Sequence, residues 1–216
     1  MGGTAIAIIY SPWGKRSGAH INPATTLAFV QLGKVAPNDA LFYILSQFVG
    51  ALLGAAVASA ALATWIAHPA VNYLVTMPGE SGPWAAFLAE IAIAFILMSV
   101  ILHVSNQRRW HSLTGICAGL LVALYIAVEA PVSGMSMNPA RSFASAVPAH
   151  QWRHLWIYFT APLIGMLSAA QLYLRTHGAA QVHCAKLHHQ NSQRCIFCGK
   201  AATSSSPASP NSKLAA

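Results

Sequence analysis

Two asparagines with matching neighbours are the residues best placed to do chemistry. Asn22 follows Ser-Gly-Ala-His-Ile and precedes Pro-Ala, and Asn138 follows Ser-Gly-Met-Ser-Met and precedes Pro-Ala, 116 residues later. Asparagine is a strong helix N-cap and proline suits the first turn of a helix, so we expect short helices over residues 23–33 and 139–146. Each asparagine then presents an amide donor, which suits hydrogen bonding to a small neutral molecule. The motif residues are Asn22, Pro23, Ala24, Asn138, Pro139 and Ala140.

The residues before each asparagine add hydrogen-bond acceptors. We expect each Ser-Gly-x-x-x stretch to be extended, and irregular backbone at membrane depth is tolerated only where it lines a cavity. Its carbonyl groups would then face a pore. These positions are Gly18, Ala19, His20 and Ile21 in the first copy, and Gly134, Met135, Ser136 and Met137 in the second. The sequence shows no nucleophile–base set or phosphate loop, so we expect a protein that is not an enzyme.

A second group of reactive side chains lies near the C-terminus. Between residues 183 and 198 the chain places Cys184, His188, His189, Cys195 and Cys198. Thiolate and imidazole ligands in a reducing compartment favour a four-coordinate zinc site, and the Cys-x2-Cys pair is its strongest element. Two other interpretations stay open: a tail whose cysteines and histidines share no role, and a redox sensor.

The elements that position these residues must cross a membrane. The 216-residue chain is 56% hydrophobic and 7% charged, whereas soluble domains are about 25% charged. Apolar runs over residues 40–66, 84–104, 113–128 and 155–174 approach or exceed the roughly 20 residues that span a bilayer, and a fifth run over residues 2–10 is too short. The net charge of +8 forms no basic stripe, so we expect no nucleic-acid partner. The sequence predicts an all-α, multi-pass membrane protein.

The distribution of charge predicts an orientation. Lys15, Arg16, Lys34, the loop over residues 106–111 and the tail from residue 175 are basic, whereas residues 68–83 contain no Lys or Arg. The positive-inside rule therefore places the C-terminus in the cytoplasm, in a plasma or inner membrane. Three apolar runs separate the two motifs, so the motifs enter from opposite faces as an inverted repeat. The positive ends of their helix dipoles would meet near the midplane.

The paired Ser-Gly-x-x-x-Asn-Pro-Ala motifs, the second continuing into Arg141, resemble those of the aquaporin family of major intrinsic proteins across residues 2–174. The resemblance implies passive conduction of water or small uncharged solutes, with protons and ions excluded. It also implies that transport needs no cofactor, and that the protein is a homotetramer in the lipid bilayer. Glu90, within an apolar run, resembles the buried carboxylate that braces the backbone of the second motif.

The resemblance also implies a four-residue selectivity filter. Spacing from the asparagines places it at Gly2, Ile126, Met135 and Arg141. Strict water channels of the family carry a histidine where this chain has Ile126 and an aromatic residue where it has Gly2, so this filter is more apolar. Ser142 and the aromatic pair at residues 158–159, by contrast, are typical of water-type members. We therefore expect conduction of water together with small uncharged solutes.

The chain departs from the family in its first repeat. The family has six spans, whereas here the first span is missing and the next is shortened to residues 2–12, about 16 Å of helix. We expect about five spans in a channel domain over residues 1–174, a cytoplasmic Cys/His-rich segment over 175–200, and a disordered Ser/Ala/Pro segment over 201–216. Either a start codon placed too late or a decayed or truncated copy would account for the missing span. In the first case the upstream sequence should encode a glutamate that mirrors Glu90.

Two other functions stay open from the sequence. Secondary transporters also use inverted repeats and broken helices, although Glu90 is the one carboxylate within an apolar run, which leaves little for a coupling-ion site. The other alternative is a truncated, non-conducting membrane protein whose cytoplasmic tail binds metal. Flux that ignores proton and sodium gradients would argue against a transporter.

Overall fold

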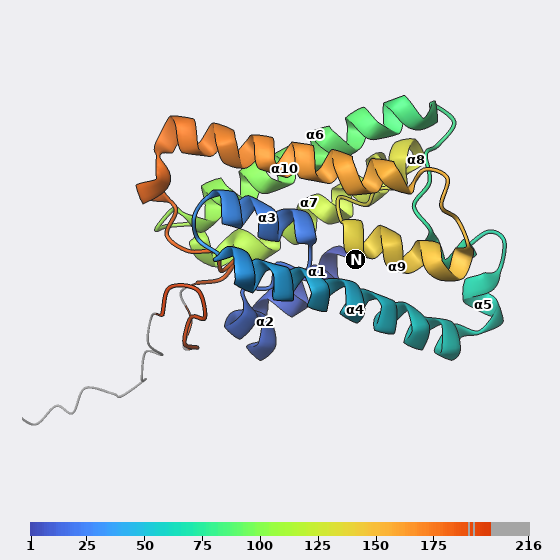
Figure 1. The fold of residues 1–216 in the computed structure, drawn as a ribbon, viewed down its shortest axis with the longest axis horizontal. Coiled ribbons are helices and arrows are strands. Elements are labelled where there is room, and N and C mark those ends of the chain that lie inside the picture. Colours follow the sequence, from blue (N-terminus) through green and yellow to red (C-terminus); the bar gives the residue numbers. More distant parts are fainter. Residues whose placement is uncertain (190, 192, 200–216) are drawn as a thin grey trace, which may run out of the picture.

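The computed structural model describes residues 1–189, 191 and 193–199, and every regular element within them is a helix (Figure 1). The Ser/Ala/Pro segment predicted to be disordered, residues 201–216, lies outside the described residues. Four units are long and apolar enough to cross a membrane: α4 (Pro37–Leu62), α6 (Gly82–Ser105), His111–Val128 with α7 (Thr114–Val128), and α10 (Leu155–His177). The prediction of an all-α membrane fold is confirmed.

Prolines mark where several helices begin, and a residue with a positive φ marks where α4 ends. Prolines occupy the first turns of α2 (Pro12–Ser17), α3 (Pro23–Gln31), α4 and α9 (Pro139–Ala149), where the missing N–H costs nothing. The apolar run over residues 40–66 does not form one helix, because Ala63 leaves helical geometry with φ 42° and the short α5 (Thr64–Ala67) follows. Apolar composition alone could not show that break.

The two Asn-Pro-Ala segments occupy the middle of the molecule. In Figure 1, α3 and α9 lie between α10 and α6 on one side and α4 on the other. Helix α3 packs on α10 and α4, and α9 packs on α4. Each half-helix is thus held by long helices, and their N-terminal ends face one another near the chain's N-terminus.

Close helix contacts fix this frame at two glycines. α6 and α10 lie side by side, and a Cβ on Gly165 would fall 2.4 Å from the carbonyl oxygen of Ile91. α1 (Gly2–Tyr10) packs on α7 in the same way, since a Cβ on Gly2 would fall 2.3 Å from the carbonyl oxygen of Gly119. The frame tolerates no side chain at either position.

Helix α4 differs from the other spans in its burial. Only 6% of its apolar window is buried, against 44% for α6 and for α10. Its large exposed hydrophobic side chains are Leu41, Phe42, Leu45, Val49, Leu53, Val57 and Leu62. An apolar helix with so little burial suits lipid or another protein surface rather than water.

Short helices join the spans. They are α8 (Ala130–Ser133) and the 3-10 turns η1 (Asn72–Leu74), η2 (His111–Leu113) and η3 (Ala179–Gln181). Beyond η3 the chain turns back beneath the bundle, and Val182, Ala185 and Leu187 belong to the same hydrophobic core as α3 and α6. The Cys/His-rich segment therefore packs on the helical domain.

Candidate conduction site

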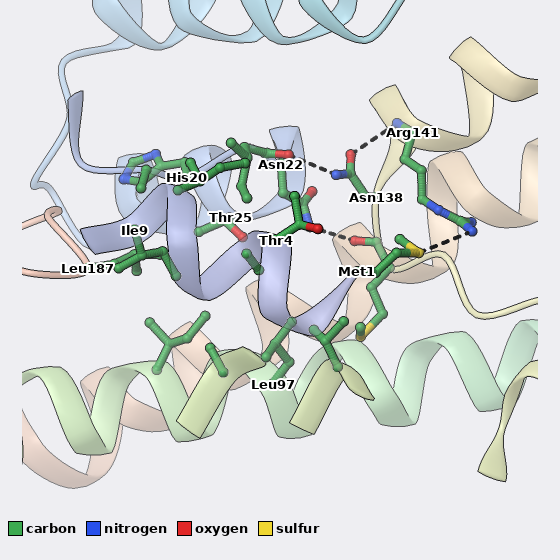
Figure 2. Close-up of a pocket in the computed structure, with 18 of the residues that line it drawn as sticks. Met1, Thr4, Ile9, His20, Asn22, Thr25, Leu97, Asn138, Arg141 and Leu187 are labelled. Carbon is green, nitrogen blue, oxygen red and sulfur yellow. Dashed lines mark hydrogen bonds between the residues drawn. The ribbon is translucent and has the colours of Figure 1, made fainter. Parts of the chain in front are cut away.

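The two asparagines cap their half-helices and also bind each other's loops. Asn22 Oδ1 accepts from the backbone N–H of Ala24 at 2.9 Å, and Asn138 Oδ1 accepts from that of Ala140 at 3.1 Å. The amide of Asn22 donates to the carbonyl of Met137 at 2.7 Å, and the amide of Asn138 donates to that of Ile21 at 2.8 Å. Figure 2 shows the side chain of Asn138 directed at the loop that carries Asn22. Residues 116 positions apart thus form one symmetric unit.

The loops before the asparagines repeat the same backbone conformation. Left-handed φ values occur at Gly18 (90°), Ala19 (56°) and Ile21 (45°), and again at Gly134 (80°), Met135 (46°) and Met137 (53°). For residues with a side chain this conformation costs about 1–3 kcal/mol each, unless the surroundings impose it. Each loop therefore needs strong local support.

Glu90 supplies that support to the second loop. One carboxylate oxygen accepts from the backbone N–H of Ser136 at 2.6 Å and from the hydroxyl of Ser133 at 2.9 Å, and the other accepts from the N–H of Met137 at 2.7 Å. Tyr158, which is fully buried, donates from its hydroxyl to the carbonyl of Ser133 at 2.5 Å. The tyrosine's part in this loop was not apparent from the sequence.

A hydroxyl network joins the second loop to α9. Ser142 Oγ lies 2.5 Å from Ser136 Oγ and 2.6 Å from Thr76 Oγ1. All three side chains are buried, so each hydroxyl finds its partner inside the protein. Thr76 carries no sequence signal of this role, because it lies in a loop 66 residues from Ser142.

The first loop is held differently. The backbone N–H of His20 donates to the hydroxyl of Tyr43 in α4 at 3.2 Å. The ring of His20 lies 3.1 Å from Thr26 Oγ1 and 2.7 Å from the carbonyl oxygen of Ala185, and Leu187 N–H donates to the carbonyl of Gly18 at 3.2 Å. This loop therefore depends on α4 and on the C-terminal segment.

A cavity of about 270 Å³ lies beside both loops (Figure 2). It is mostly apolar, with hydrogen-bonding groups gathered at the two asparagines and Arg141. Its lining comes from α1, both loops, α3, α6, α7, α9 and the C-terminal segment: Met1, Thr4, Ala5, Ile8, Ile9, Ala19, His20, Ile21, Asn22, Thr25, Leu97, Ile101, Ala118, Val122, Met135, Ser136, Met137, Asn138, Arg141 and Leu187. Apolar walls with a few converging polar groups suit small neutral molecules.

Comparison with known families decides what this arrangement is. The family model described as Major intrinsic protein matches residues 1–173. This chain belongs to the major intrinsic protein family. The family resemblance seen in the sequence is confirmed.

Similar members of the family come from plants. Aquaporin NIP2-2 of Zea mays is 40% identical over 174 residues, which are 80% of this chain and 57% of that protein. Putative aquaporin NIP4-1 of Arabidopsis thaliana is 37% identical over 169 residues, 78% of this chain and 58% of that protein. This major intrinsic protein thus spans somewhat under three-fifths of the length of these relatives.

A solved structure shares the fold. The aquaglyceroporin from Plasmodium falciparum aligns with a TM-score of 0.67 at 20% identity, over 83% of this chain and 91% of that one. At this identity the likeness concerns the fold: the arrangement of spans and half-helices is that of the major intrinsic proteins.

The structure brings together two of the four residues expected in a family filter. Met135 and Arg141 line the cavity, whereas Gly2 and Ile126 are not among the described residues that line it. Gly2 instead faces α7, because its bare backbone allows α1 to approach Gly119. Spacing along the chain predicted Gly2 as the filter residue, but spacing does not show which side of α1 packs against α7.

Arg141 directs its charge at this cavity. Its Nη2 donates to the sulfur of Met1 at 3.8 Å, and its buried Nη1 has no hydrogen-bond partner among the described residues. Met1 therefore lies beside Arg141 in the cavity lining. A guanidinium with an unused N–H can donate a hydrogen bond to an acceptor in the cavity.

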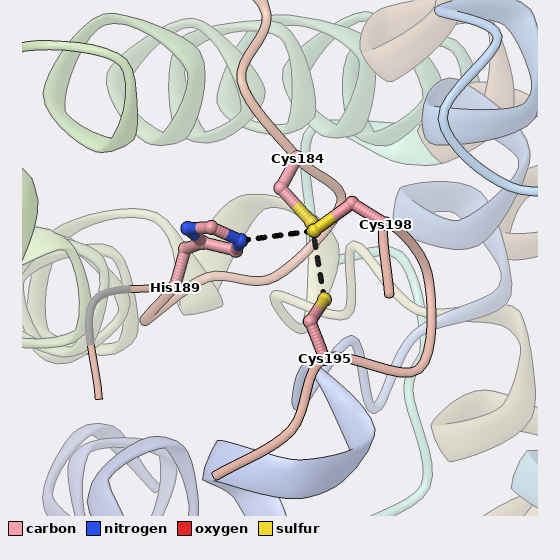
Figure 3. Close-up of side chains that lie close together, drawn as sticks. All are labelled: Cys184, His189, Cys195 and Cys198. Carbon is pink, nitrogen blue, oxygen red and sulfur yellow. Dashed lines mark hydrogen bonds between the residues drawn. The ribbon is translucent and has the colours of Figure 1, made fainter. Parts of the chain in front are cut away.

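The cysteines and one histidine of this major intrinsic protein form a compact donor set (Figure 3). Ligand atoms of Cys184, His189, Cys195 and Cys198 all lie within 4.8 Å of one another. Sγ of Cys184 is 3.4 Å from Sγ of Cys195, and Nε2 of His189 is 3.2 Å from Sγ of Cys198. His188 is not part of this set, because its ring packs against that of Tyr10 at 5.0 Å.

The local environment differs between two of these thiols. Burial raises the pKa of Cys184 to about 12. Burial also acts to raise the pKa of Cys195, but backbone N–H groups of Cys198 and Phe197 and hydrogen bonds to both neighbouring thiols outweigh it, and this pKa lies below its ordinary value. Cys195 is thus the thiol whose surroundings favour the thiolate that metals bind.

Proposed function

We propose that this chain is a passive transmembrane channel for water and small uncharged solutes. The observation that carries the proposal is the pair of reciprocal bonds between Asn22 and Asn138 and the opposite loops, beside a cavity. The N-terminal ends of α3 and α9 supply hydrogen-bond donors. The loops before them, in which several residues have left-handed φ values, supply backbone carbonyl acceptors, so that together they form a short path of donors and acceptors. Such a path replaces the hydrogen bonds of a neutral molecule and offers no site for chemistry.

The cavity's composition indicates the solute class. Met135 and Ile9 contribute apolar wall, while Arg141 and the two asparagines contribute donors. A molecule that fits must be small, uncharged and able to accept hydrogen bonds, as water, urea and small polyols are. The relatives named above are plant aquaporins and an aquaglyceroporin, and their names support this solute class.

Exclusion of protons and ions follows from the same parts. The positive dipole ends of α3 and α9 meet beside the guanidinium of Arg141, which raises the energy of any cation there. A hydrogen bond to the opposite loop orients the amide of each asparagine. A water molecule between the two asparagines can accept hydrogen bonds from these amides, but the amides do not relay protons. We propose that protons and ions do not pass.

Orientation and assembly complete the proposal. The basic segments at Lys15 and at residues 106–111 lie at the end where the C-terminal segment docks, since Asn191 approaches Lys15 O at 3.5 Å and His183 N–H donates to Asn106 at 2.8 Å. The positive-inside rule makes this end cytoplasmic, in a plasma or inner membrane. The barely buried α4 supports contact with lipid and with other copies in a homotetramer.

Isotopic uptake separates a channel from a transporter. Proteoliposomes holding the full chain in metal-free buffer should take up labelled urea and glycerol faster than empty liposomes, at rates that proton and sodium gradients leave unchanged. Uptake that such gradients accelerate would favour a transporter. Uptake equal to that of empty liposomes would contradict solute conduction.

A second function rests on the donor set in Figure 3. We propose that Cys184, His189, Cys195 and Cys198 bind one zinc ion. Three thiolates and one imidazole suit zinc, whose bonds to sulfur of about 2.3 Å place neighbouring sulfurs about 3.8 Å apart, close to the 3.4 Å seen here.

The full chain in detergent should bind one cobalt ion with thiolate charge-transfer absorption that zinc abolishes. Cys195→Ser should lose the band, and its persistence would contradict the site.

A further inference from the structure

The C-terminal segment covers the first loop of the conduction site. Leu187 N–H donates to the carbonyl of Gly18 at 3.2 Å, and the carbonyl of Ala185 accepts from Nε2 of His20 at 2.7 Å. Ala185 is fully buried and Leu187 is 4% exposed. Residues 185–187 therefore run along the backbone that was expected to supply acceptors to a solute.

The aromatic side chain of Phe197 packs against the same loop, at Gly18 and His20. The ring of Phe197 stacks on that of His20 with centroids 5.4 Å apart and planes 3° apart, and it also meets Tyr43 at 6.4 Å. A Cβ added to Gly18 would lie 2.6 Å from Phe197, so the ring lies directly on the glycine backbone.

The same segment also reaches the cavity. Leu187 lines it together with Asn22, and Figure 2 shows the leucine at the end where His20 lies. The carbonyl of Gly18 is already bound by the segment's own N–H. While these contacts persist, Leu187 occupies this end of the cavity, and the segment's N–H takes one of the two lone pairs of the Gly18 carbonyl oxygen.

The metal-binding residues bracket these contacts. Cys184 directly precedes Ala185, and Cys195 and Cys198 flank Phe197. An ion bound by both parts ties residues 185–187 to the turn at Phe197, and this constraint removes much of the conformational entropy that opposes docking. A ligand that binds one state more tightly shifts the equilibrium toward that state.

We propose that zinc held by Cys184, His189, Cys195 and Cys198 keeps this segment docked on Gly18 and His20 and closes the cytoplasmic mouth of the channel. The cluster is then a regulatory metal site, and removal of zinc opens the path. This inference rests on the proposed channel function.

The test measures osmotic water permeability of proteoliposomes by stopped-flow light scattering, with metal content measured on the same protein. The full chain loaded with zinc chloride should conduct slowly, and a chelator on the cytoplasmic side should raise permeability roughly tenfold or more, since zinc well above its dissociation constant favours docking by up to about 100-fold. Cys195→Ser should conduct rapidly and hold no zinc. Cys117→Ser, which alters the cysteine outside the cluster, should respond to zinc as the unaltered chain does.

Two further variants test the docking itself. Phe197→Ala and Leu187→Ser keep all four metal ligands, so each should still bind one zinc ion yet conduct whether or not zinc is present. If both stay closed with zinc, or if every variant conducts alike with and without zinc, the closure is wrong while the channel function stands. If no variant conducts under any condition, the channel function fails and the closure fails with it.

Discussion

Glu90 shows how a single side chain can make a strained loop possible. A carboxylate inside an apolar helix is costly unless hydrogen bonds satisfy it, and Glu90 accepts from two backbone N–H groups and one hydroxyl. Those N–H groups belong to residues at or beside left-handed positions. The loop's donors offset the free energy of burying the carboxylate, and the carboxylate's hydrogen bonds offset the strain of the loop. For this reason the carboxylate and the strained loop occur together.

Replacing Glu90 by glutamine should therefore destabilise the protein. Gln keeps the size but has one acceptor oxygen, so an N–H of the second loop loses its partner. We expect a loss of about 1–3 kcal/mol, measured as a lower Tm in detergent. Glu80→Gln, at an exposed glutamate in the loop before α6, is the control and should leave Tm unchanged. Equal melting of both variants would contradict the brace.

Arg141 should determine which solutes pass rather than the rate of water flux. A unit charge 4 Å from a passing cation contributes about 4 kcal/mol at an effective dielectric of 20, so Arg141→Val should admit cations and larger solutes while water flux stays the same or rises. Planar-bilayer conductance and glycerol uptake, both with chelator present, measure this. Arg153→Val, at an exposed arginine between α9 and α10, should change neither. An unchanged solute profile in Arg141→Val would contradict the placement of the filter.

Residue types predicted some of these positions and not others. Asn22, Asn138 and Glu90 could be found from the sequence, because a capping asparagine before proline and a carboxylate in an apolar run are both costly and local features. Tyr43, Tyr158 and Met1 could not be found, since their roles depend on contacts more than 20 residues away. Spacing predicted Gly2 for the filter, but spacing does not reveal which face of a helix packs on its neighbour.

At the scale of elements, close crossings hold the half-helices in place. The α6–α10 contact depends on Gly165, where the backbone of the two helices meets, and the sequence-similar Gly50 in α4 has no atom within 4 Å of a Cβ built on it. Each glycine lies in the long helix that follows an Asn-Pro-Ala motif, Gly50 28 residues after Asn22 and Gly165 27 residues after Asn138. The structure gives only one of them a close neighbour among the described residues.

This difference predicts opposite effects of one substitution. Gly165→Ala should cost about 1–3 kcal/mol, because the new methyl group overlaps the carbonyl oxygen of Ile91 and the helices must separate. Gly50→Ala should be neutral, or more stable by up to about 1 kcal/mol, since alanine is the better helix former. Thermal unfolding in detergent compares them directly. A Gly165→Ala protein as stable as the unaltered chain would show that α6 and α10 are not locked at this crossing.

Elements were predictable where apolar runs were long and their limits were marked by proline. α6 and α10 follow their predicted runs within a few residues, and α3 and α9 begin at the expected prolines. The break at Ala63 and the docking of the C-terminal segment were not predicted. Both depend on how the chain folds back on itself, which periodicity and composition do not record.

At the scale of the whole molecule, the repeat is symmetric in its loops and asymmetric in their support. Glu90 holds the second loop from within the membrane domain. Tyr43 and the C-terminal segment, which carries the Cys/His donor set, hold the first loop. Under the proposed zinc-dependent closure, Glu90 would support one half of the path permanently, and the C-terminal segment would cover the other half only while zinc is bound.

The initial rate of osmotic shrinkage of proteoliposomes tests the central claim, that the paired asparagine loops form a water path. Measured with chelator present, the full chain should shrink liposomes much faster than empty ones, with a weaker temperature dependence than diffusion through lipid. The double variant Asn22→Ala, Asn138→Ala, which removes both amide donors, should return the rate to that of empty liposomes. A full chain that shrinks no faster than empty liposomes, or a double variant that conducts as well as the unaltered chain, would contradict the claim.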